Sequence, residues 1–226
     1  FVRIPYADDN LVRLPDNMDF VTAAVLGCRF ITAWRGVTAQ GALKAGDFIA
    51  VHGCGGVGLS AIMIAAAVGA VPIAIDIDDG KLEFAKSIGA TYTINARAVS
   101  QVAGTVMELT GGGAHVSVDA LGSRETCTNS ILCLRKQGKH IQLGLMAGNE
   151  ANPPLPMHVV IARELQLIGS HGMQAHQYPM MMDWIIKGRM HPEKLLGRII
   201  TLEEGCEALT DLDSFRNTGV TVIRFG

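Results

Sequence analysis

The chain has 226 residues, of which 49% are hydrophobic and 18% are charged, and its formal net charge is -2. This length is enough for one large hydrophobic core, or for one domain with an appended segment. The near-neutral charge gives no electrostatic reason to expect nucleic acid or an anionic membrane as a partner. No apolar run reaches the roughly 20 residues that span a bilayer, and the start does not resemble a signal peptide.

The cysteines form an odd, scattered set, which predicts no disulfide framework and favours a reducing cytoplasm. They are Cys28, Cys54, Cys127, Cys133 and Cys206. The first residue is Phe1 rather than Met, in the strand-like stretch FVRIPYADDNLVRLP. We therefore expect the chain to begin partway through something larger.

From residue 47 onward, short β-branched runs alternate with longer helical runs. The candidate strands are DFIAVHG (47–53), VPIAIDID (71–78), TYTIN (91–95), HVSVDAL (115–121), KHIQLGL (139–145) and LQLIGSH (165–171). Helices are predicted at Leu59–Val68, Lys81–Ile88, Ala98–Leu109, Arg124–Lys136 and Met157–Arg163. Nearly continuous hydrophobicity is typical of strands buried on both faces. The alternation predicts an α/β Rossmann fold, a doubly wound six-stranded parallel sheet with helices on both faces.

The part of the chain that begins at Met173 has a different pattern. It predicts a helix at His176–Lys187, a strand at 194–201 (KLLGRIIT), a helix at Leu202–Leu212 and a final strand at 221–225 (TVIRF). We therefore expect this segment to stand apart from the six-stranded sheet. Met180, Met181 and Met182 in its first helix are interpreted as core or interface filler.

A glycine-rich turn separates the first candidate strand from the first helix. Gly53, Gly55 and Gly58 spell G-x-G-x-x-G, and Gly56 and Val57 lie between them. The first glycine permits the sharp turn, the second lets the backbone approach a pyrophosphate, and the third lets the helix pack closely on the strand. The helix then points free N–H groups and its positive dipole end at the phosphates. Because a strand precedes the motif and a helix follows it, we interpret it as a dinucleotide-binding turn rather than a purely structural one.

The second candidate strand ends in Asp76, about 20 residues after the glycines, where a ribose-binding acid is expected. A carboxylate accepts hydrogen bonds from ribose hydroxyls and repels the 2′-phosphate of NADP, so the sequence favours NAD. Lys81 is the nearby cation, and we expect it to touch the ribose. The alternative for Asp76 is a helix N-cap.

Two stretches resemble the zinc-dependent alcohol dehydrogenases of the medium-chain superfamily. They are AAVLGCRFITAWRGV and GDFIAVHGCGGVGLSAIMIAAAVGAVPIAIDIDDGKLEFAKSIGATYTIN. In that family a Cys before the first Rossmann strand is a ligand of the catalytic zinc, and a Thr four residues later lies beside the nicotinamide. The resemblance thus implies that Cys28 is a zinc ligand and Thr32 a catalytic and cofactor-binding residue. A lone Cys without this resemblance is more often a small buried hydrophobe.

The resemblance also implies a reaction. Zinc acts as a Lewis acid on the oxygen of a small-molecule alcohol, and a hydride passes to NAD to give an aldehyde or ketone. The residues expected to flank the nicotinamide on the carboxyl ends of the fourth and fifth strands are Leu121, Leu143, Gly144 and Leu145. In the family the sixth strand builds a dimer, so we expect a homodimer or homotetramer through residues 165–170, whose sheet edge is open to pairing.

The family has a preceding catalytic (GroES-like) domain that supplies the other zinc ligands, and one Cys does not make a catalytic zinc site. We therefore divide the chain into the end of that domain and a linker (1–27), an NAD-binding Rossmann domain (28–172), and a segment returning to the catalytic domain (173–226). Val220 stands where many relatives have a Lys or Arg near the phosphates, and Arg198 or Arg224 is a possible substitute.

Two other functions stay open. The chain is alternatively a non-catalytic NAD-binding and dimerisation module, active only with a separate catalytic domain. It is also compatible with a zinc-independent quinone reductase relative, although Cys28 and Asp76 both argue against that interpretation.

Overall fold

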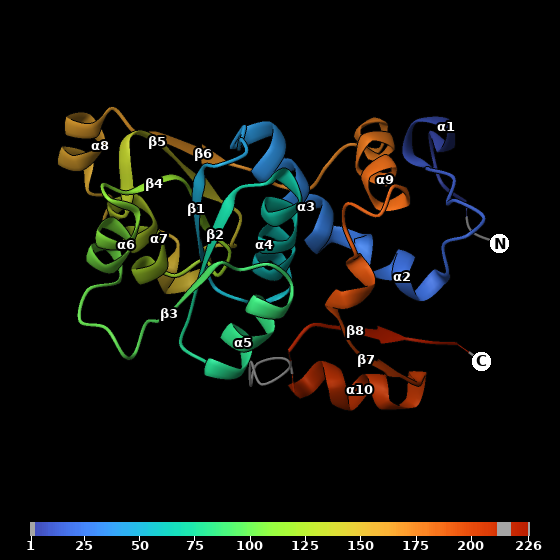
Figure 1. Ribbon diagram of the computed structural model, residues 1–226. Helices are drawn as coiled ribbons and strands as arrows, with labels where there is room; N and C mark the ends of the chain where they lie inside the picture. The colour runs from blue at the N-terminus through green and yellow to red at the C-terminus, as the bar shows by residue number, and fades with distance from the viewer. Residues whose placement is uncertain (1–2, 212–217, 226) are drawn as a thin grey trace.

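The computed structural model describes residues 3–211 and 218–225, and its centre is a six-stranded parallel sheet (Figure 1). The strand order is β3-β2-β1-β4-β5-β6. The strands are β1 (Phe48–His52), β2 (Val71–Asp76), β3 (Tyr92–Asn95), β4 (Ala114–Asp119), β5 (Leu134–Gln142) and β6 (Gln166–Gly169). This order confirms the predicted Rossmann fold, and the crevice between β1 and β4 is where such sheets bind nucleotides.

Helices cover both faces of this sheet. The sheet helices are α4 (Gly56–Val68), α5 (Asp79–Ser87), α6 (Val102–Thr110), α7 (Arg124–Leu132) and α8 (Met157–Arg163). One core cluster joins α4 and α5 to the sheet, and a second joins α6 and α7 to its other face. Ile49 and Ala50 alternate between these two clusters, as neighbouring residues of a strand must. Gly69 ends α4 with a φ of 87°, the left-handed conformation that is common for a glycine after a helix.

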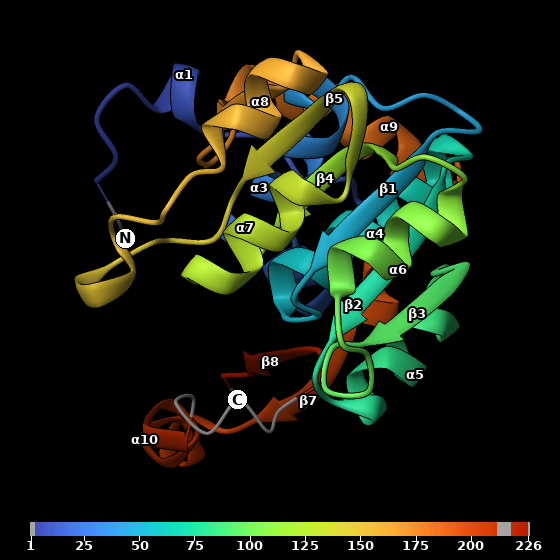
Figure 2. The same cartoon turned by 90° about the vertical axis from the view of Figure 1, so that its left-hand side faces the viewer.

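The flanking segments fold against the same sheet unit. Before the sheet lie α1 (Ala7–Asn10), α2 (Phe20–Val25) and α3 (Ile31–Trp34), and after it lie α9 (Tyr178–Ile186), β7 (Leu196–Ile200), α10 (Leu202–Thr210) and β8 (Val220–Ile223). β7 and β8 form a separate two-stranded parallel sheet. Figures 1 and 2 both place this small sheet and α10 at the same end of the molecule as α5, away from α8.

Several predicted boundaries are wrong. The helix predicted at Arg124–Lys136 ends at Leu132, because β5 already begins at Leu134 and then loops out through Gln137, whose φ is 60°. The helix predicted from Ala98 begins at Val102. The predicted end of α10 at Leu212 lies outside the described residues, as do Phe1 and Val2.

The start of the chain also differs from expectation. Instead of an extended stretch, the described residues there contain the one-turn helix Ala7–Asn10. The expectation of no membrane-length apolar run was wrong as well, because Phe20–Gln40 is a helical run of 21 residues that is long and apolar enough to cross a bilayer. It is broken at Gly27, and Phe30, Ala33 and Trp34 are buried in the sheet core. This packing accounts for its apolar composition as that of a core helix.

Candidate dinucleotide-binding site

The glycine turn has the backbone that its sequence predicts. Gly53 follows β1 with a φ of 94°, in the left-handed region that favours glycine. A side chain at Gly58 would overlap the carbonyl oxygen of Gly53, so α4 approaches the strand as closely as only glycine permits. Leu59 donates its N–H to the carbonyl of Gly55 at 2.8 Å, which closes the first turn of α4. The motif is therefore a strand-to-helix turn with a structural requirement for its first and third glycines.

The second glycine lies in open space. A side chain at Gly55 would meet no atom within 4 Å, and Gly55 caps α4 without any side-chain hydrogen bond. The first N–H groups of a helix have no partner inside the helix, and its dipole is positive at that end. The open side of Gly55 therefore gives an anion both space and backbone donors.

Asp76 lies at the end of β2 and connects this turn to the next loop. Its carboxylate accepts the N–H of Cys54 at 2.7 Å, and the N–H groups of Ile77 and Asp78 at 2.7 and 3.1 Å. The N-cap of α5 is instead Asp78, which accepts the N–H of Lys81 at 3.1 Å. The N-cap alternative for Asp76 is therefore wrong. The side chain is half-buried next to the glycine turn.

A cavity of about 500 Å³ opens in front of the turn. Gly55, Gly56, Val57 and Lys81 line it together with Ala120, Arg29 and residues of β7, β8 and α10. Gly55, Gly56 and Lys81 thus share one cavity, whereas Gly53 and Gly58 do not line it. Its floor is part of the Rossmann sheet unit, and its other wall belongs to the C-terminal segment.

The residues predicted at the nicotinamide end lie outside this cavity, on the loops after β4 and β5. Leu121 packs on the glycine turn, because a side chain at Gly53 would come within 3.2 Å of its Cβ. Leu143 is buried and Leu145 is 76% exposed. Gly144 lies so close to the backbone of Gly122 that a side chain there would overlap it. β5 ends at Gln142, so these residues follow the strand instead of ending it.

Asp119 holds these two loops together, and sequence reasoning missed it. One oxygen of this fully buried carboxylate accepts the N–H groups of Leu121 at 3.0 Å and Gly122 at 2.9 Å. The other accepts the Nε2 of Gln142 at 2.9 Å, and Gln142 also donates to the carbonyl of Gly144 at 2.9 Å. An acid at the end of a buried strand, in HVSVDAL, was the signal for this role.

A buried polar chain continues from Gln142 into the sheet. His140 contacts the Oε1 of Gln142 at 3.1 Å through Nε2 and Ser130 at 2.8 Å through Nδ1. His52 is 1% exposed, and burial, reinforced by His140, lowers the pKa of its imidazole to about 3. Burial also lowers the pKa of His140. Both imidazoles are therefore neutral at pH 7, and His52 is a buried core residue at the end of β1.

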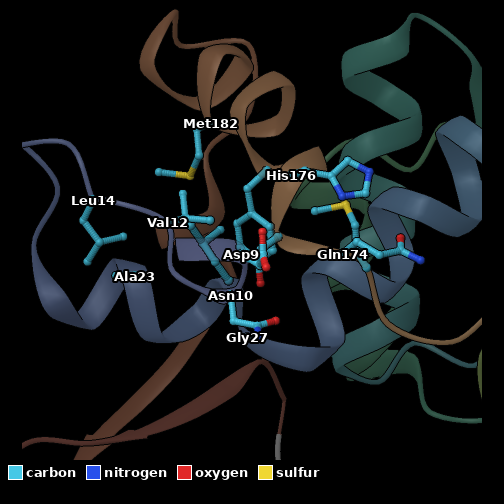
Figure 3. Close-up of a pocket in the computed structure, with 13 residues that line it drawn as sticks. Asp9, Asn10, Val12, Leu14, Ala23, Gly27, Gln174, His176 and Met182 are labelled. Carbon is cyan, nitrogen blue, oxygen red and sulfur yellow. The ribbon is translucent and has the colours of Figure 1, made fainter. Parts of the chain in front are cut away.

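Cys28 lies one helical turn before Thr32, within the helical run Phe20–Gln40. Its thiol is exposed, with Sγ 4.0 Å from the Oγ1 of Thr32, and that hydroxyl accepts the N–H of Gly172 at 3.2 Å. A second cavity of about 540 Å³ opens beside Gly27, between the N-terminal segment and residues 173–182 (Figure 3). His176 is one of the residues that line it.

The donors near Cys28 do not make a zinc site by themselves. Across residues 3–211 and 218–225, no group of three or more His, Cys, Asp or Glu side chains could hold a metal ion. A catalytic zinc needs about three protein ligands. Cys54, Cys127 and Cys133 are buried, burial raises the pKa of each thiol, and all five cysteines are free.

Comparison with known proteins agrees with this geometry. The family described as zinc-binding dehydrogenase matches residues 56–187, which is more than half of the sequence. The chain belongs to this zinc-binding dehydrogenase family. The match begins at Gly56, within the glycine turn, and ends at Lys187, just after α9.

Relatives and solved structures are similar over most of the chain. An NAD-dependent alcohol dehydrogenase of Sulfurisphaera tokodaii is 31% identical over 209 residues, which is 92% of this chain and 58% of the relative. A zinc-type alcohol dehydrogenase-like protein of Schizosaccharomyces pombe is 37% identical over 64% of this chain and 42% of its own length. The structure of an alcohol dehydrogenase from Thermus sp. ATN1 has a TM-score of 0.86 at 30% identity, covering 98% of this chain and 64% of that one. The chain thus spans about half the length of the curated relatives that it matches.

Proposed function

We propose that this chain is the NAD-binding part of an oxidoreductase that transfers a hydride between a small-molecule alcohol and NAD. The observation that carries the proposal is the cavity in front of the glycine turn, which is open at Gly55, together with the half-buried carboxylate of Asp76, which accepts the N–H of Cys54 in that turn. The family membership supports the reaction class, because the similar relatives are named alcohol dehydrogenases.

Each predicted residue has a role that its position supports. The N–H groups at the start of α4 bind the pyrophosphate, and the open side of Gly55 lets it approach. Asp76 accepts hydrogen bonds from the adenosine ribose and disfavours a 2′-phosphate. When bound, NAD supplies the hydride acceptor for alcohol oxidation. Thr32 and the loops held by Asp119 (Leu121 and Leu143 to Leu145) position the nicotinamide end.

A catalytic zinc requires more ligands than the described residues bring together. The described residues hold one donor at the expected place, the exposed thiol of Cys28, so they do not fit a catalytic zinc by themselves. We propose that Cys28 contributes one ligand and that a further domain contributes the others. The cavity beside Gly27 lies where such a domain would meet this chain.

We also propose that two or more copies associate through β6. This strand pairs only with β5 and forms the edge of the sheet. Unpaired N–H and C=O groups of an edge strand are open to pairing with another strand. The free cysteines support a reducing cytoplasmic location.

One alternative has a specific observation in its favour. The absence of a three-donor metal group among the described residues favours a non-catalytic NAD-binding and dimerisation module that acts with a separate catalytic domain. The NAD site is the same in both proposals, so a binding experiment on this chain tests what they share.

The test is a calorimetric titration of the chain with NAD and with NADP, before and after Asp76→Ser. We expect NAD to bind more tightly in the unmodified chain. Asp76→Ser should shift the NAD-to-NADP affinity ratio about tenfold toward NADP, equivalent to about 1.4 kcal/mol, because a charge that repels the 2′-phosphate is removed.

Asp78→Ser is the matched control. It removes the same charge two residues away and keeps a side chain that caps α5, so it should leave the affinity ratio near its original value. An unchanged ratio in Asp76→Ser, with melting temperatures showing that both variants fold, would contradict the role of Asp76. An unmodified chain that binds neither nucleotide would contradict the proposed function.

A further inference from the structure

Arg29 lies over the first residue of α4. A side chain added at Gly56 would come within 2.5 Å of the Cδ of Arg29, and within 3.3 Å of its Nε and Nη1. The guanidinium therefore rests on the start of the helix that follows the glycine turn. Arg29 also lines the 500 Å³ cavity, together with Gly55, Val57 and Lys81.

This is an unfavourable place for an isolated cation. The start of a helix carries positive partial charge, so a positive side chain there is repelled instead of stabilised. Arg29 is exposed and, within the described part of the chain, its side chain has no hydrogen bond or ion pair that would compensate. An anion bound between Arg29 and the N–H groups of α4 would satisfy both positive groups at once.

The other candidate cations point elsewhere. Val220 is 9% exposed and packs in the core, so no charge enters the cavity from that position. Arg198 donates its Nε to the hydroxyl of Thr221 at 3.3 Å and lines a different hollow, and Arg224 lines a third. Of the described residues that line the cavity, the cationic ones are Arg29 and Lys81. Neither substitute suggested by the sequence thus faces the glycine turn.

We propose that Arg29 binds the pyrophosphate of the dinucleotide and supplies the positive charge that Val220 does not. The inference rests on the proposed function, because it takes NAD as the ligand of the cavity. A guanidinium presents several N–H donors in a fixed plane and binds phosphate oxygens in pairs, which suits a group with two adjacent phosphates. Arg29 is therefore a binding residue that precedes the Rossmann sheet in sequence and reaches its helix in space.

The test is calorimetry with three ligands that separate the phosphates from the rest of the nucleotide: NAD, ADP and adenosine. Arg29→Ala should weaken NAD and ADP about 10- to 100-fold, the range expected for a lost charge-assisted hydrogen bond. Its affinity for adenosine should not change, because adenosine carries no phosphate. The affinities of Arg29→Lys for NAD and ADP should lie between those of the unmodified chain and those of Arg29→Ala, since a lysine keeps the charge but not the paired donors.

Arg198→Ala and Arg224→Ala are the matched controls, each removing one positive charge from the C-terminal segment at a residue that does not line the cavity. Both should leave ADP affinity within about twofold of the original, a difference smaller than 0.5 kcal/mol. If Arg29→Ala leaves ADP affinity unchanged or strengthens it, the proposal is wrong, and a gain would mean that Arg29 occupies the space of the phosphates.

The same data separate this proposal from the broader one. Binding of NAD that depends on Asp76 but not on Arg29 keeps the proposed function and removes the role of Arg29. Binding of ADP that depends on Arg29, without any binding of NAD, keeps Arg29 as a diphosphate ligand and removes the proposed function. No binding of NAD, ADP or adenosine overturns both.

Discussion

The six-stranded sheet and the flanking segments differ in how fully the residues of their strands are buried. Along β1 every residue from Ile49 to His52 is buried, and β2 is buried from Pro72 to Ile75. Along β7 only the last residue, Ile200, is buried. The large sheet has helices on both faces, whereas the small sheet buries Val220 and Val222 of β8 in the main core cluster and leaves β7 exposed from Gly197 to Ile199.

Large exposed apolar side chains occur in both regions. Phe20 is 84% exposed, Leu209 70% and Phe225 71% in the flanking segments, and Leu145 is 76% and Ile161 75% exposed in the sheet unit. Exposed apolar side chains that stand singly are ordinary in folded proteins, so the two regions differ in the burial of their strands and not in their exposed apolar residues.

The two regions are nevertheless joined by a defined contact. Trp34 of α3 and Trp184 of α9 pack edge to face with ring centroids 5.2 Å apart, and Arg189 lies 3.7 Å above the ring of Trp184. Met181 and Met190 are buried in the same cluster as the sheet residues. Because the chain has two tryptophans, its fluorescence reports this junction. The effects of substitutions in the two regions on stability can therefore be compared in the same chain.

Two glycine substitutions should give the largest contrast. Gly58→Ala places a methyl group against the carbonyl of Gly53 in the sheet unit, and Gly197→Ala places one against the carbonyl of Thr218 between β7 and β8. We expect Gly58→Ala to cost about 3 kcal/mol or more of global stability, because both groups are backbone and neither can move aside. Gly197→Ala should separate β7 from β8 and leave global stability nearly unchanged. Urea unfolding followed by tryptophan fluorescence measures both.

Gly55→Ala is the control within the glycine turn. A side chain there meets no atom within 4 Å, so stability should stay unchanged while NAD binding weakens. If Gly197→Ala unfolds the molecule as fully as Gly58→Ala, the two regions are one cooperative unit and the contrast between them is wrong.

The sheet unit could be predicted from sequence because its signals are local and repeated. Buried strands are continuous runs of Val and Ile, and glycines after helices mark left-handed caps, as at Gly69. The start of β5 was missed because the excursion through Gln137 interrupts the strand pattern. The N-terminal helix Ala7–Asn10 was missed because one turn of helix leaves no periodic signal.

The candidate site was only partly predictable, for a different reason. The glycines and Asp76 belong to a motif with fixed spacing, so sequence alone located them. Arg29 lies 27 residues before Gly56, and its approach to the helix depends on how the run Phe20–Gln40 crosses α4. Asp119 is fixed by its contact with Gln142, the last residue of β5. Such pairings are long-range, and a periodic pattern in one segment does not contain them.

Acid should lower the stability of the sheet unit more than that of the flanking segments. The expected loss is smaller than that from Gly58→Ala and larger than that from a lost helix cap. His52 is buried with a pKa near 3, while unfolding returns it to its ordinary value of about 6.5. Because the unfolded chain then binds more protons, stability is complete above about pH 6.5 and is lost as the pH falls toward 3. His52 alone should cost about 2 kcal/mol between pH 7 and pH 5.

The comparison is between unfolding free energies in urea at pH 7 and pH 5, for the unmodified chain and for His52→Asn, which does not titrate. The variant should show a smaller loss on acidification, whatever its stability at pH 7. Equal losses in the unmodified chain and His52→Asn would mean that other groups cause the acid sensitivity.

The smallest effect should come from two helix caps of the same chemistry, one in each region. Ser123 caps α7 with Thr126 in the sheet unit, and Thr201 caps α10 with Glu204 in the C-terminal segment. Replacing a capping hydroxyl with alanine costs about 1 kcal/mol. We expect Ser123→Ala to lower global stability by that amount, because α7 unfolds only with the sheet.

Thr201→Ala should act locally instead. Amide hydrogen exchange in α10 should become about fivefold faster, the change that 1 kcal/mol produces in a local opening equilibrium, while global stability remains the same. A loss of global stability in Thr201→Ala equal to that in Ser123→Ala would show that α10 folds together with the sheet. Since α10 packs along the cavity through Gly205, Ala208 and Leu209, its local opening would also expose the wall that faces Arg29 and the glycine turn. An effect confined to α10 should therefore still weaken nucleotide binding slightly, although the sheet that carries the motif is untouched.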